Sequence, residues 1–252
     1  MLTQQTVEKL REMGLDGMAE GLAEQARQPD LRDLAFEERL GLLVDREEGH
    51  RQNRRLKRLL RGARLRLNAC LEDIDYRTPR GLDRGLMRHL ATGDWLGRGQ
   101  NVLITGPTGV GKTFIACALG NAACRRGFSA LYVRVPRILG ELALAKGDGS
   151  YPRRMNQLAR TQLLILDDWG IAPLAAAETR DLLEVIEDRS EQHSTVVASQ
   201  APLEHWHSVV TDPSLADAIL DRLVHHAHKI DMKGESMRKV LGNERQTNQE
   251  QT

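Results

Sequence analysis

Aromatic side chains are scarce in this sequence of 252 residues, because Phe, Trp and Tyr together make up 4% of it. Proteins that bind single-stranded nucleic acid without sequence preference stack its bases on aromatic rings, so the composition argues against such a groove. Cysteines are also few. Cys70, Cys117 and Cys124 are odd in number and form no CxxC motif, which argues against a disulfide framework or a zinc site and fits a reducing cytoplasm.

Long apolar runs are missing as well. No stretch approaches the roughly 20 residues that a membrane-spanning helix needs, and the N-terminus has no basic-then-apolar signal. We therefore expect a soluble cytoplasmic protein with no membrane partner. Its 40% hydrophobic and 28% charged residues are typical of a globular fold, and its length allows one α/β domain plus a small module.

The net charge of +1 excludes a uniformly basic coat protein, but it hides a regional difference. Residues 1–50 carry 12 acidic and 6 basic side chains, whereas residues 51–66 carry 8 basic and no acidic ones. Apolar residues recur at helical spacing over 4–28 and over 34–60. We therefore expect residues 1–66 to form a small all-α module with a basic end.

The basic run 51–66 has two interpretations, an ordinary solvated helix face or a binding site for a polyanion. Helical spacing places several arginines on one face, where like charges repel. Because no acidic residue lies within the run, we favour nucleic acid as the partner. The candidate DNA contacts in the run are Arg51, Arg54, Arg55, Lys57, Arg58 and Arg61.

From residue 99 onward, short β-rich runs alternate with helical ones. This alternation predicts an α/β domain whose five-stranded parallel sheet is covered by helices on both faces. We place the domain at 99–245, after a connector at 67–98 and before a disordered tail at 246–252. The expected strands are 101–105, 129–135, 163–168, 194–199 and, more weakly, 228–232.

The strongest motif is GPTGVGKT, which fits the pattern GxxxxGK[ST] between an expected strand and an expected helix. The backbone N–H groups of such a glycine-rich loop point at phosphate oxygens, and the N-terminus of the helix adds partial positive charge. Lys112 would reach the β- and γ-phosphates and Thr113 would bind Mg²⁺. The pattern alone does not separate ATP from GTP. The residues of the loop are Gly106, Pro107, Thr108, Gly109, Val110, Gly111, Lys112 and Thr113.

Two carboxylates, Asp167 and Asp168, end the expected strand 163–168. Asp167 is the candidate Mg²⁺ ligand, and Asp168 is the candidate that polarises the attacking water. The alternative is a strand end with solvated acids, but adjacent carboxylates repel unless a cation lies beside them. At the end of strand 194–199, Ser199 or Gln200 could sense the γ-phosphate, and a simple turn there is an equally good interpretation.

From pattern alone, Arg222 and Arg238 are ordinary surface arginines. Taken together and in order, however, five segments resemble the IstB family of insertion-sequence ATP-binding proteins. This family of AAA+ transposition helpers is close to the DnaC helicase loaders, and the resemblance covers almost the whole chain. The segments are GPTGVGKT, LLILDDWG, TVVASQAP, DPSLADAILDRLVHHAH and GESMR.

The resemblance implies that ATP and Mg²⁺ lie between the subunits of a homo-oligomer. Arg222 matches an arginine finger offered to the neighbour's ATP, and Arg238 matches a sensor of ATP in the same subunit. Asp167 and Asp168 match the Mg²⁺-binding and catalytic acids. Family members often carry Asp-Glu there, so Asp at position 168 puts the hydrolysis rate, rather than nucleotide binding, in question.

The resemblance also implies a role in DNA transposition. The expected protein is an AAA+ ATPase that assembles on duplex DNA and delivers a target site to a cognate transposase. Residues 136–160 correspond to a helical insertion that faces DNA, with Arg153, Arg154 and Lys146 as candidate phosphate contacts. Two alternatives stay open: a replicative helicase loader, and an ATP-gated DNA-binding scaffold with negligible turnover.

Overall fold

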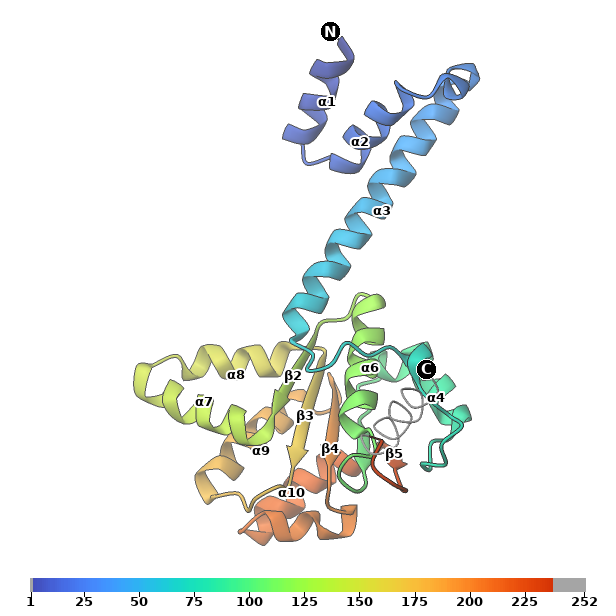
Figure 1. Cartoon of the computed structure of the whole chain (residues 1–252). Coiled ribbons are helices and arrows are strands. Elements are labelled where there is room, and N and C mark those ends of the chain that lie inside the picture. Colours follow the sequence, from blue (N-terminus) through green and yellow to red (C-terminus); the bar gives the residue numbers. More distant parts are fainter. Residues whose placement is uncertain (1, 238–252) are drawn as a thin grey trace, which may run out of the picture. The chain divides into compact units, whose positions relative to one another are not determined.

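The computed structural model describes residues 2–237, and the chain divides into two compact units, Met1–Arg58 and Leu59–Thr252. Figure 1 shows the elements of both units. The division falls inside helix α3 (Phe36–Ala63), eight residues before the expected end of the helical module. The domain boundaries drawn from the sequence stay predictions, and the expected tail 246–252 lies outside the described residues.

None of the helices in the described part is long and apolar enough to span a membrane.

The first unit is all-helical. It contains α1 (Leu2–Glu12), α2 (Asp16–Gln25), the short 3-10 helix η1 (Pro29–Asp33) and the first part of α3. Gly14 has a φ of 71° and separates α1 from α2, since glycine adopts this left-handed conformation without a steric penalty. A side chain at Gly17 would place its Cβ 2.8 Å from Arg46 O, so glycine allows α2 to pack closely against α3.

Glu47 of α3 is buried and takes the place of a helix cap for α2. Leu15, the residue that precedes α2, provides no side-chain hydrogen bond, and Glu47 instead accepts from Met18 N at 3.2 Å. Burial by itself raises the pKa of Glu47, but hydrogen bonds from Arg51 and from the backbone of Met18 and Gly17 outweigh it and lower the pKa. This single carboxylate therefore connects α2 to α3.

The second unit is built on a parallel sheet with strand order β2-β3-β4-β1-β5, which confirms the expected fold class. The strands are β1 (Val102–Thr105), β2 (Ala130–Arg134), β3 (Leu163–Trp169), β4 (Ser194–Ser199) and β5 (His228–Asp231). The helices between them are α6 (Lys112–Arg125), α7 (Val135–Asp148), α8 (Tyr151–Arg160), α9 (Ala176–Arg189), η3 (Leu203–Val209) and α10 (Pro213–Val224). All five strands lie within two residues of their expected bounds.

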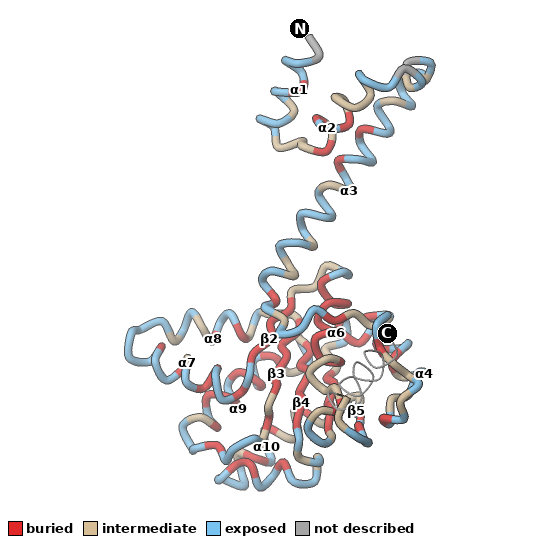
Figure 2. Tube along the Cα trace, in the orientation of Figure 1, coloured by how far each residue is buried: buried red, intermediate tan, exposed pale blue. Residues whose placement is uncertain are grey.

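Alternation along the strands distributes the core between the two faces of the sheet. On β3, Leu164 and Leu166 belong to one apolar cluster with residues of α7, α8, α9 and α10. Ile165 points the other way, towards α6, where its Cδ1 would lie 2.8 Å from a Cβ placed at Gly120. Figure 2 shows buried residues concentrated on the strands and on α6. Both faces of the sheet are covered, as near-continuous apolar strands require.

The segment expected as a connector, 67–98, contributes to the core of the second unit. It contains the 3-10 helix η2 (Leu71–Asp73), α4 (Arg84–Thr92) and α5 (Asp94–Gly97). Met87, Leu90 and Trp95 are buried. Asp83 begins α4 by accepting hydrogen bonds from Gly85 N and Leu86 N.

Candidate nucleotide-binding site

The glycine-rich loop Gly106–Thr113 connects β1 to α6 and has the backbone conformation that its motif demands. Gly106 and Gly111 have φ values of 140° and 105°, which side-chain-bearing residues rarely adopt. A Cβ at Gly106 would lie 2.2 Å from Met232 O, so any other residue there would displace the chain after β5. The loop therefore presents its backbone at the N-terminus of α6, where anions bind.

A cavity of about 440 Å³ lies beside this loop. Three parts of the sequence that were singled out as functional meet in its walls: the loop, the two adjacent carboxylates and the residue after β4. The second unit thus brings together groups that the parallel sheet places at the carboxyl ends of its strands. The lining residues are Arg66, Leu67, Thr108, Gly109, Gly111, Lys112, Thr113, Phe114, Arg134, Asp167, Asp168, Ile171, Ala198, Gln200 and Met237.

Lys112 opens α6 with its ammonium group held over the loop. Its Nζ donates to Gly106 O at 2.6 Å and to Pro107 O at 2.8 Å. Burial lowers the pKa of Lys112, while the carboxylates of Asp167 and Asp168 oppose that change. The side chain is therefore a positive charge placed against the loop that would surround a phosphate chain.

Asp167 is almost fully buried, with 2% of its surface exposed. Its Oδ2 accepts from Thr113 Oγ1 at 2.8 Å and from the hydroxyl of Tyr132 at 2.6 Å. Burial and the bond to Asp167 raise the pKa of Tyr132, so this phenol stays a neutral donor. Thr113 and Asp167 offer adjacent hydroxyl and carboxylate oxygens, which are the donor types that Mg²⁺ prefers.

Asp168 occupies an irregular position in β3. Its φ is 61°, and the pairing of β3 with β4 shifts register between Leu166 and Trp169. Asp tolerates the left-handed region better than most residues, and the irregularity turns its carboxylate into the cavity. There Asp168 forms an ion pair with Nε of Arg134, at the end of β2.

The structure separates Ser199 from Gln200, which the sequence could not do. Ser199 is fully buried; its hydroxyl donates to Trp169 O at 2.8 Å and accepts from Ala201 N at 3.1 Å. Gln200 lines the cavity and accepts from Thr108 Oγ1 of the loop at 2.7 Å. Of the two candidates, Gln200 therefore lines the cavity, whereas the hydroxyl of Ser199 is used within the turn.

Arg222 does not line the cavity of its own chain. It lies on α10, where its Nη2 is 2.7 Å from Glu187 Oε1 and its Nη1 donates to Ala218 O at 2.9 Å. Arg238 lies outside the described residues. The residue before it, Met237, lines the cavity and donates its N–H to Gly109 O at 3.0 Å.

The basic run of α3 is less free of acidic partners than its sequence indicates. Arg51 is paired with Glu47 one turn earlier, at 2.6 Å, and Arg54 lies 3.4 Å from Asp16 of α2. The expectation that no acid relieves the run was therefore wrong for these two arginines, because their partners lie outside residues 51–66. Lys57, Arg58 and Arg61 are exposed.

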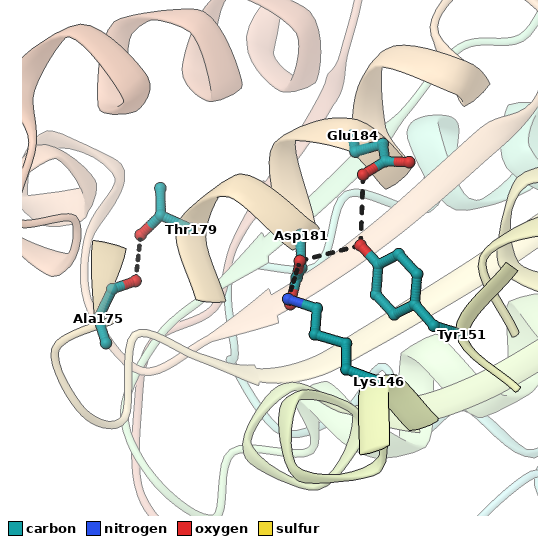
Figure 3. A network of polar contacts seen from close by, with 6 residues as sticks. All are labelled: Lys146, Tyr151, Ala175, Thr179, Asp181 and Glu184. Atoms are coloured by element: carbon teal, nitrogen blue, oxygen red, sulfur yellow. Dashed lines mark hydrogen bonds and ion pairs between the residues drawn. The ribbon is translucent and has the colours of Figure 1, made fainter. Parts of the chain in front are cut away.

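The expected insertion 136–160 is the helical hairpin of α7 and α8, broken at Gly149, whose φ is 78°. Arg153 is exposed, whereas the side chain of Arg154 is only 15% exposed and lies 2.6 Å from Glu141. Lys146, whose side chain is 45% exposed, forms an ion pair with Asp181 of α9, with its Nζ 2.7 Å from both carboxylate oxygens (Figure 3). This ion pair braces the hairpin against α9, and a phosphate contact of Lys146 stays a prediction.

Among the residues of the site that sequence reasoning missed are Tyr132 and Arg134. Both lie on β2, and the expected strand 129–135 already contained them. Because parallel strands end at one edge of the sheet, a charged residue at the end of a neighbouring strand is a signal that could have been used. Arg134 is such a residue, whereas nothing in the sequence pattern distinguishes Tyr132 from an ordinary strand tyrosine.

The strand order, the loop at the end of β1 and the carboxylates at the end of β3 define a P-loop nucleotide-binding domain of the AAA+ class. Its fold is similar to the crystal structure of the DnaC helicase loader, with a TM-score of 0.57, 18% identity and coverage of 66% of this chain and 97% of that one. The DnaI crystal structure is also similar, with a TM-score of 0.57, 22% identity and coverage of 70% and 93%.

The chain belongs to the family described as IstB-like ATP binding protein, whose model matches residues 8–245. An insertion sequence ATP-binding protein (y4pL) of Sinorhizobium fredii strain NBRC 101917 / NGR234 is 51% identical over 239 residues, 95% of this chain and 98% of that protein. The ATP-binding protein of insertion sequence IS1162 from Pseudomonas fluorescens is 53% identical over 203 residues, 80% and 88% of the two chains. The family resemblance seen in the sequence is thus confirmed.

Proposed function

We propose that this chain is an AAA+ ATPase that assembles on duplex DNA in the presence of ATP and delivers a target site to a transposase. Membership of the insertion-sequence ATP-binding family supports the link to transposition and to ATP. The loop, Lys112 and Gln200 would bind the triphosphate. Thr113 and Asp167 would hold Mg²⁺ together with phosphate oxygens, and the ion would neutralise charge that develops on the transferred phosphoryl group.

One observation carries the proposal of a homo-oligomer: Arg222, the candidate finger, does not line the nucleotide cavity of its own chain and lies elsewhere on the same unit. Arg222 is 32% exposed on α10, paired with the 46% exposed Glu187. Exposed ion pairs are weak, so Arg222 could leave Glu187 for a stronger anion. The ATP of a neighbouring copy is such an anion, and an arginine supplied to it stabilises the transition state.

Mixing two inactive variants tests this arrangement. Lys112→Ala removes ATP binding but retains Arg222, and Arg222→Ala retains the cavity but offers no arginine. Neither variant alone should release phosphate from ATP on duplex DNA. An equimolar mixture should recover activity, because Lys112→Ala copies present Arg222 to the ATP of Arg222→Ala copies. A mixture as inactive as its components would remove Arg222 from the proposed site.

A second candidate function is an ATP-gated DNA-binding scaffold that hydrolyses ATP negligibly. The observation that favours it is the ion pair between Asp168 and Arg134, which engages the carboxylate that would otherwise act as the base. Phosphate release measured with and without DNA separates the two functions. Pull-down with a transposase and with a replicative helicase would separate the transposition role from that of a helicase loader.

A further inference from the structure

Asn101 is a buried polar residue directly before β1, and the proposed function does not use it. The residue is 9% exposed, and the strand that follows it leads into the phosphate-binding loop. A buried amide is costly unless its donors and its acceptor have hydrogen-bond partners. The partners of Asn101 therefore indicate what its side chain does.

The side chain of Asn101 joins the end of α10 to the sheet. Its Nδ2 donates to Arg222 O at 3.0 Å and to Leu223 O at 3.2 Å. Its Oδ1 accepts from Thr195 N of β4 at 2.9 Å. Because two carbonyl groups need donors and one N–H group needs an acceptor, these partners determine the orientation of the amide. Both amide donors are thus used on α10, while the amide oxygen is bonded to β4.

Asn101 is itself held between two strands. Its backbone oxygen accepts from His228 N of β5 at 2.9 Å. On the other side, Thr195 Oγ1 accepts from Nε of Arg189 at 3.2 Å, and this fully buried guanidinium group also donates to Ser194 O. The amide of Asn101 therefore has a fixed position in the sheet.

The last turn of α10 needs partners of this kind. A helix leaves its last four carbonyl groups without a partner inside the helix, and in α10 they belong to residues 221–224. The first and the last of the four accept from N–H groups that follow the helix, at 3.1 Å in both cases. His225, the residue after α10, has a φ of −64°, so the helix does not end in the left-handed cap that commonly bonds such carbonyls. The two carbonyls in the middle are those that Asn101 bonds.

Arg222 thereby combines a fixed backbone with an exchangeable side-chain partner. Its carbonyl is bonded to Asn101, whereas its guanidinium group is paired with Glu187 in an exposed ion pair, which is weak. A catalytic group that is misplaced by about 1 Å can cost about 10²-fold in rate. An arginine that acts on the ATP of a neighbouring copy therefore needs its backbone in a defined place.

We propose that Asn101 is a positioning residue for Arg222. By bonding the carbonyl of Arg222, it determines where the guanidinium group can reach in the nucleotide site of a neighbouring copy. The inference rests on the shared site of the proposed function and adds to it the residue that fixes the finger. Asn101 does not line the nucleotide cavity of its own chain, so its loss should change turnover rather than ATP affinity.

The test places Asn101→Asp in either of the two copies that are mixed to recover activity. Asp keeps an acceptor for Thr195 N, but it turns a carboxylate towards the end of α10, where negative charge is unfavourable. In the first mixture, copies with Lys112→Ala and Asn101→Asp donate the finger, and Arg222→Ala copies bind ATP. In the second mixture, Lys112→Ala copies donate the finger, and copies with Arg222→Ala and Asn101→Asp bind ATP. Phosphate release on duplex DNA is measured over a range of ATP concentrations, after circular dichroism has shown that each variant is folded.

Gln100→Glu in the finger-donating copy is the matched control. Gln100 is the neighbouring amide, and its Oε1 lies 3.1 Å from Nε2 of His228, so its bond is to β5 rather than to α10. The same change from amide to carboxylate should leave the recovered activity as it is. If Asn101→Asp does not fold, Asn101→Ala takes its place in both mixtures, because it removes the same two donations.

The first mixture should release phosphate about 10²-fold more slowly at saturating ATP than the mixture without the Asn101 change, with the same KM for ATP. The second mixture should keep the recovered activity, because its changed copies offer no finger. Equal losses in the two mixtures would assign Asn101 to the general stability of the unit and overturn the proposal, as would no loss in either. A larger loss in the second mixture would show that Asn101 acts through its own loop, which also overturns it. If the original mixture of Lys112→Ala and Arg222→Ala stays inactive, the shared site of the proposed function is refuted, and the role of Asn101 falls with it.

Discussion

The nucleotide cavity and the basic run of α3 are both regions where an anion would bind, yet they are built in opposite ways. In the cavity, groups of opposite charge come from different strands, and Asp167 is 2% exposed. On α3, like charges follow one another along a single helix and are largely exposed (Figure 2). The fold thus fixes the positions of the charged groups in the cavity, whereas the exposed charges of the helix are not fixed in a site by the rest of the chain.

The two regions differ in how firmly a function can be assigned to their residues. Inside the cavity, Lys112, Asp167 and Gln200 have defined partners within hydrogen-bond distance, so a substitution has one expected consequence. On α3, an arginine can pair with a neighbouring carboxylate as readily as with a phosphate, as Arg51 does with Glu47. Charge on an exposed helix is therefore a weaker sign of function than charge converging in a cavity.

The largest effect is expected for Arg222→Ala, which asks whether the cavity is complete within one chain. Loss of an arginine finger lowers the rate by about 10³–10⁵-fold, so phosphate release should nearly vanish while ATP binding persists. Fluorescent ATP titration and phosphate release measure the two quantities. Arg180→Ala, an exposed arginine on α9, is the control. Full activity of Arg222→Ala would show that one chain provides the whole site.

The second prediction separates the two adjacent carboxylates of the cavity. Asp168→Asn should lower turnover by about 10²–10⁴-fold, the usual contribution of a general base, and leave the ATP affinity intact. Asn tolerates the left-handed backbone of position 168 as Asp does. Asp167→Asn should instead weaken Mg²⁺-dependent nucleotide binding, because its carboxylate bonds Thr113.

Comparing initial phosphate-release rates with nucleotide affinities distinguishes these two losses. Identical behaviour of the two Asn variants would contradict their separate roles. Arg134→Gln serves as the matched test of the ion pair at Asp168. It should preserve or raise turnover if the pair restrains the base, and a loss as deep as that of Asp168→Asn would show that Arg134 itself contacts the phosphates.

Much of this site could be predicted because its information is local in the sequence. The loop Gly106–Thr113 is contiguous, and each strand is a short apolar run that is bounded by polar residues or glycine. What escaped prediction depends on pairing between distant segments. Arg134 and Asp168 are 34 positions apart, and their meeting follows from β2 lying next to β3. The order of the strands, which cannot be read from any single segment, therefore decides that Arg134 pairs with Asp168.

The helical unit shows the same limit. Helical spacing over residues 4–28 is a local signal and predicts helix there, and the structure divides this stretch into α1 and α2 at Gly14. It gives no sign that Glu47 caps α2, since the acceptor and Met18 are 29 positions apart. The charge count over residues 51–66 missed the partners of Arg51 and Arg54 for the same reason. Their partners, Glu47 and Asp16, lie outside the counted residues and are brought close by packing.

The third prediction concerns Glu47, the acid that links the basic run to the core of the first unit. Glu47→Gln should destabilise this unit by about 1.5–3 kcal/mol, the usual contribution of hydrogen bonds to a charged group. Hydrogen–deuterium exchange at Met18 N measures the effect directly. Glu48→Gln is the control, because Glu48 is exposed and accepts from Gln52 at 3.0 Å. Exchange that is equally fast in both variants would remove the capping role.

The pH dependence of that unit follows from the lowered pKa of Glu47. A carboxyl group with a lower pKa in the folded state stabilises the fold above its unfolded pKa, and this stabilisation is lost as the pH falls through the folded value. Wild-type protection at Met18 should therefore decline on acidification below the ordinary Glu range. Glu47→Gln should show a flatter profile, and an equally steep one would assign the acid sensitivity to another group.

The smallest effect is expected for substitutions on α3. They test most directly whether the basic run binds an anion at all. Lys57 and Arg58 are exposed and have no ion pair within the described part of the chain, whereas Arg51 and Arg54 each have one. If the run binds DNA, Lys57→Gln with Arg58→Gln should reduce the log–log salt slope by about 0.9 for each phosphate that is no longer neutralised. Arg51→Gln with Arg54→Gln should reduce it less, because forming a phosphate contact there first costs an existing ion pair. Salt titrations of duplex DNA binding measure both slopes. Equal slopes in the two variants and the wild type would identify the run as a solvated helix face, and the cavity would then remain as the one region of the comparison that binds an anion.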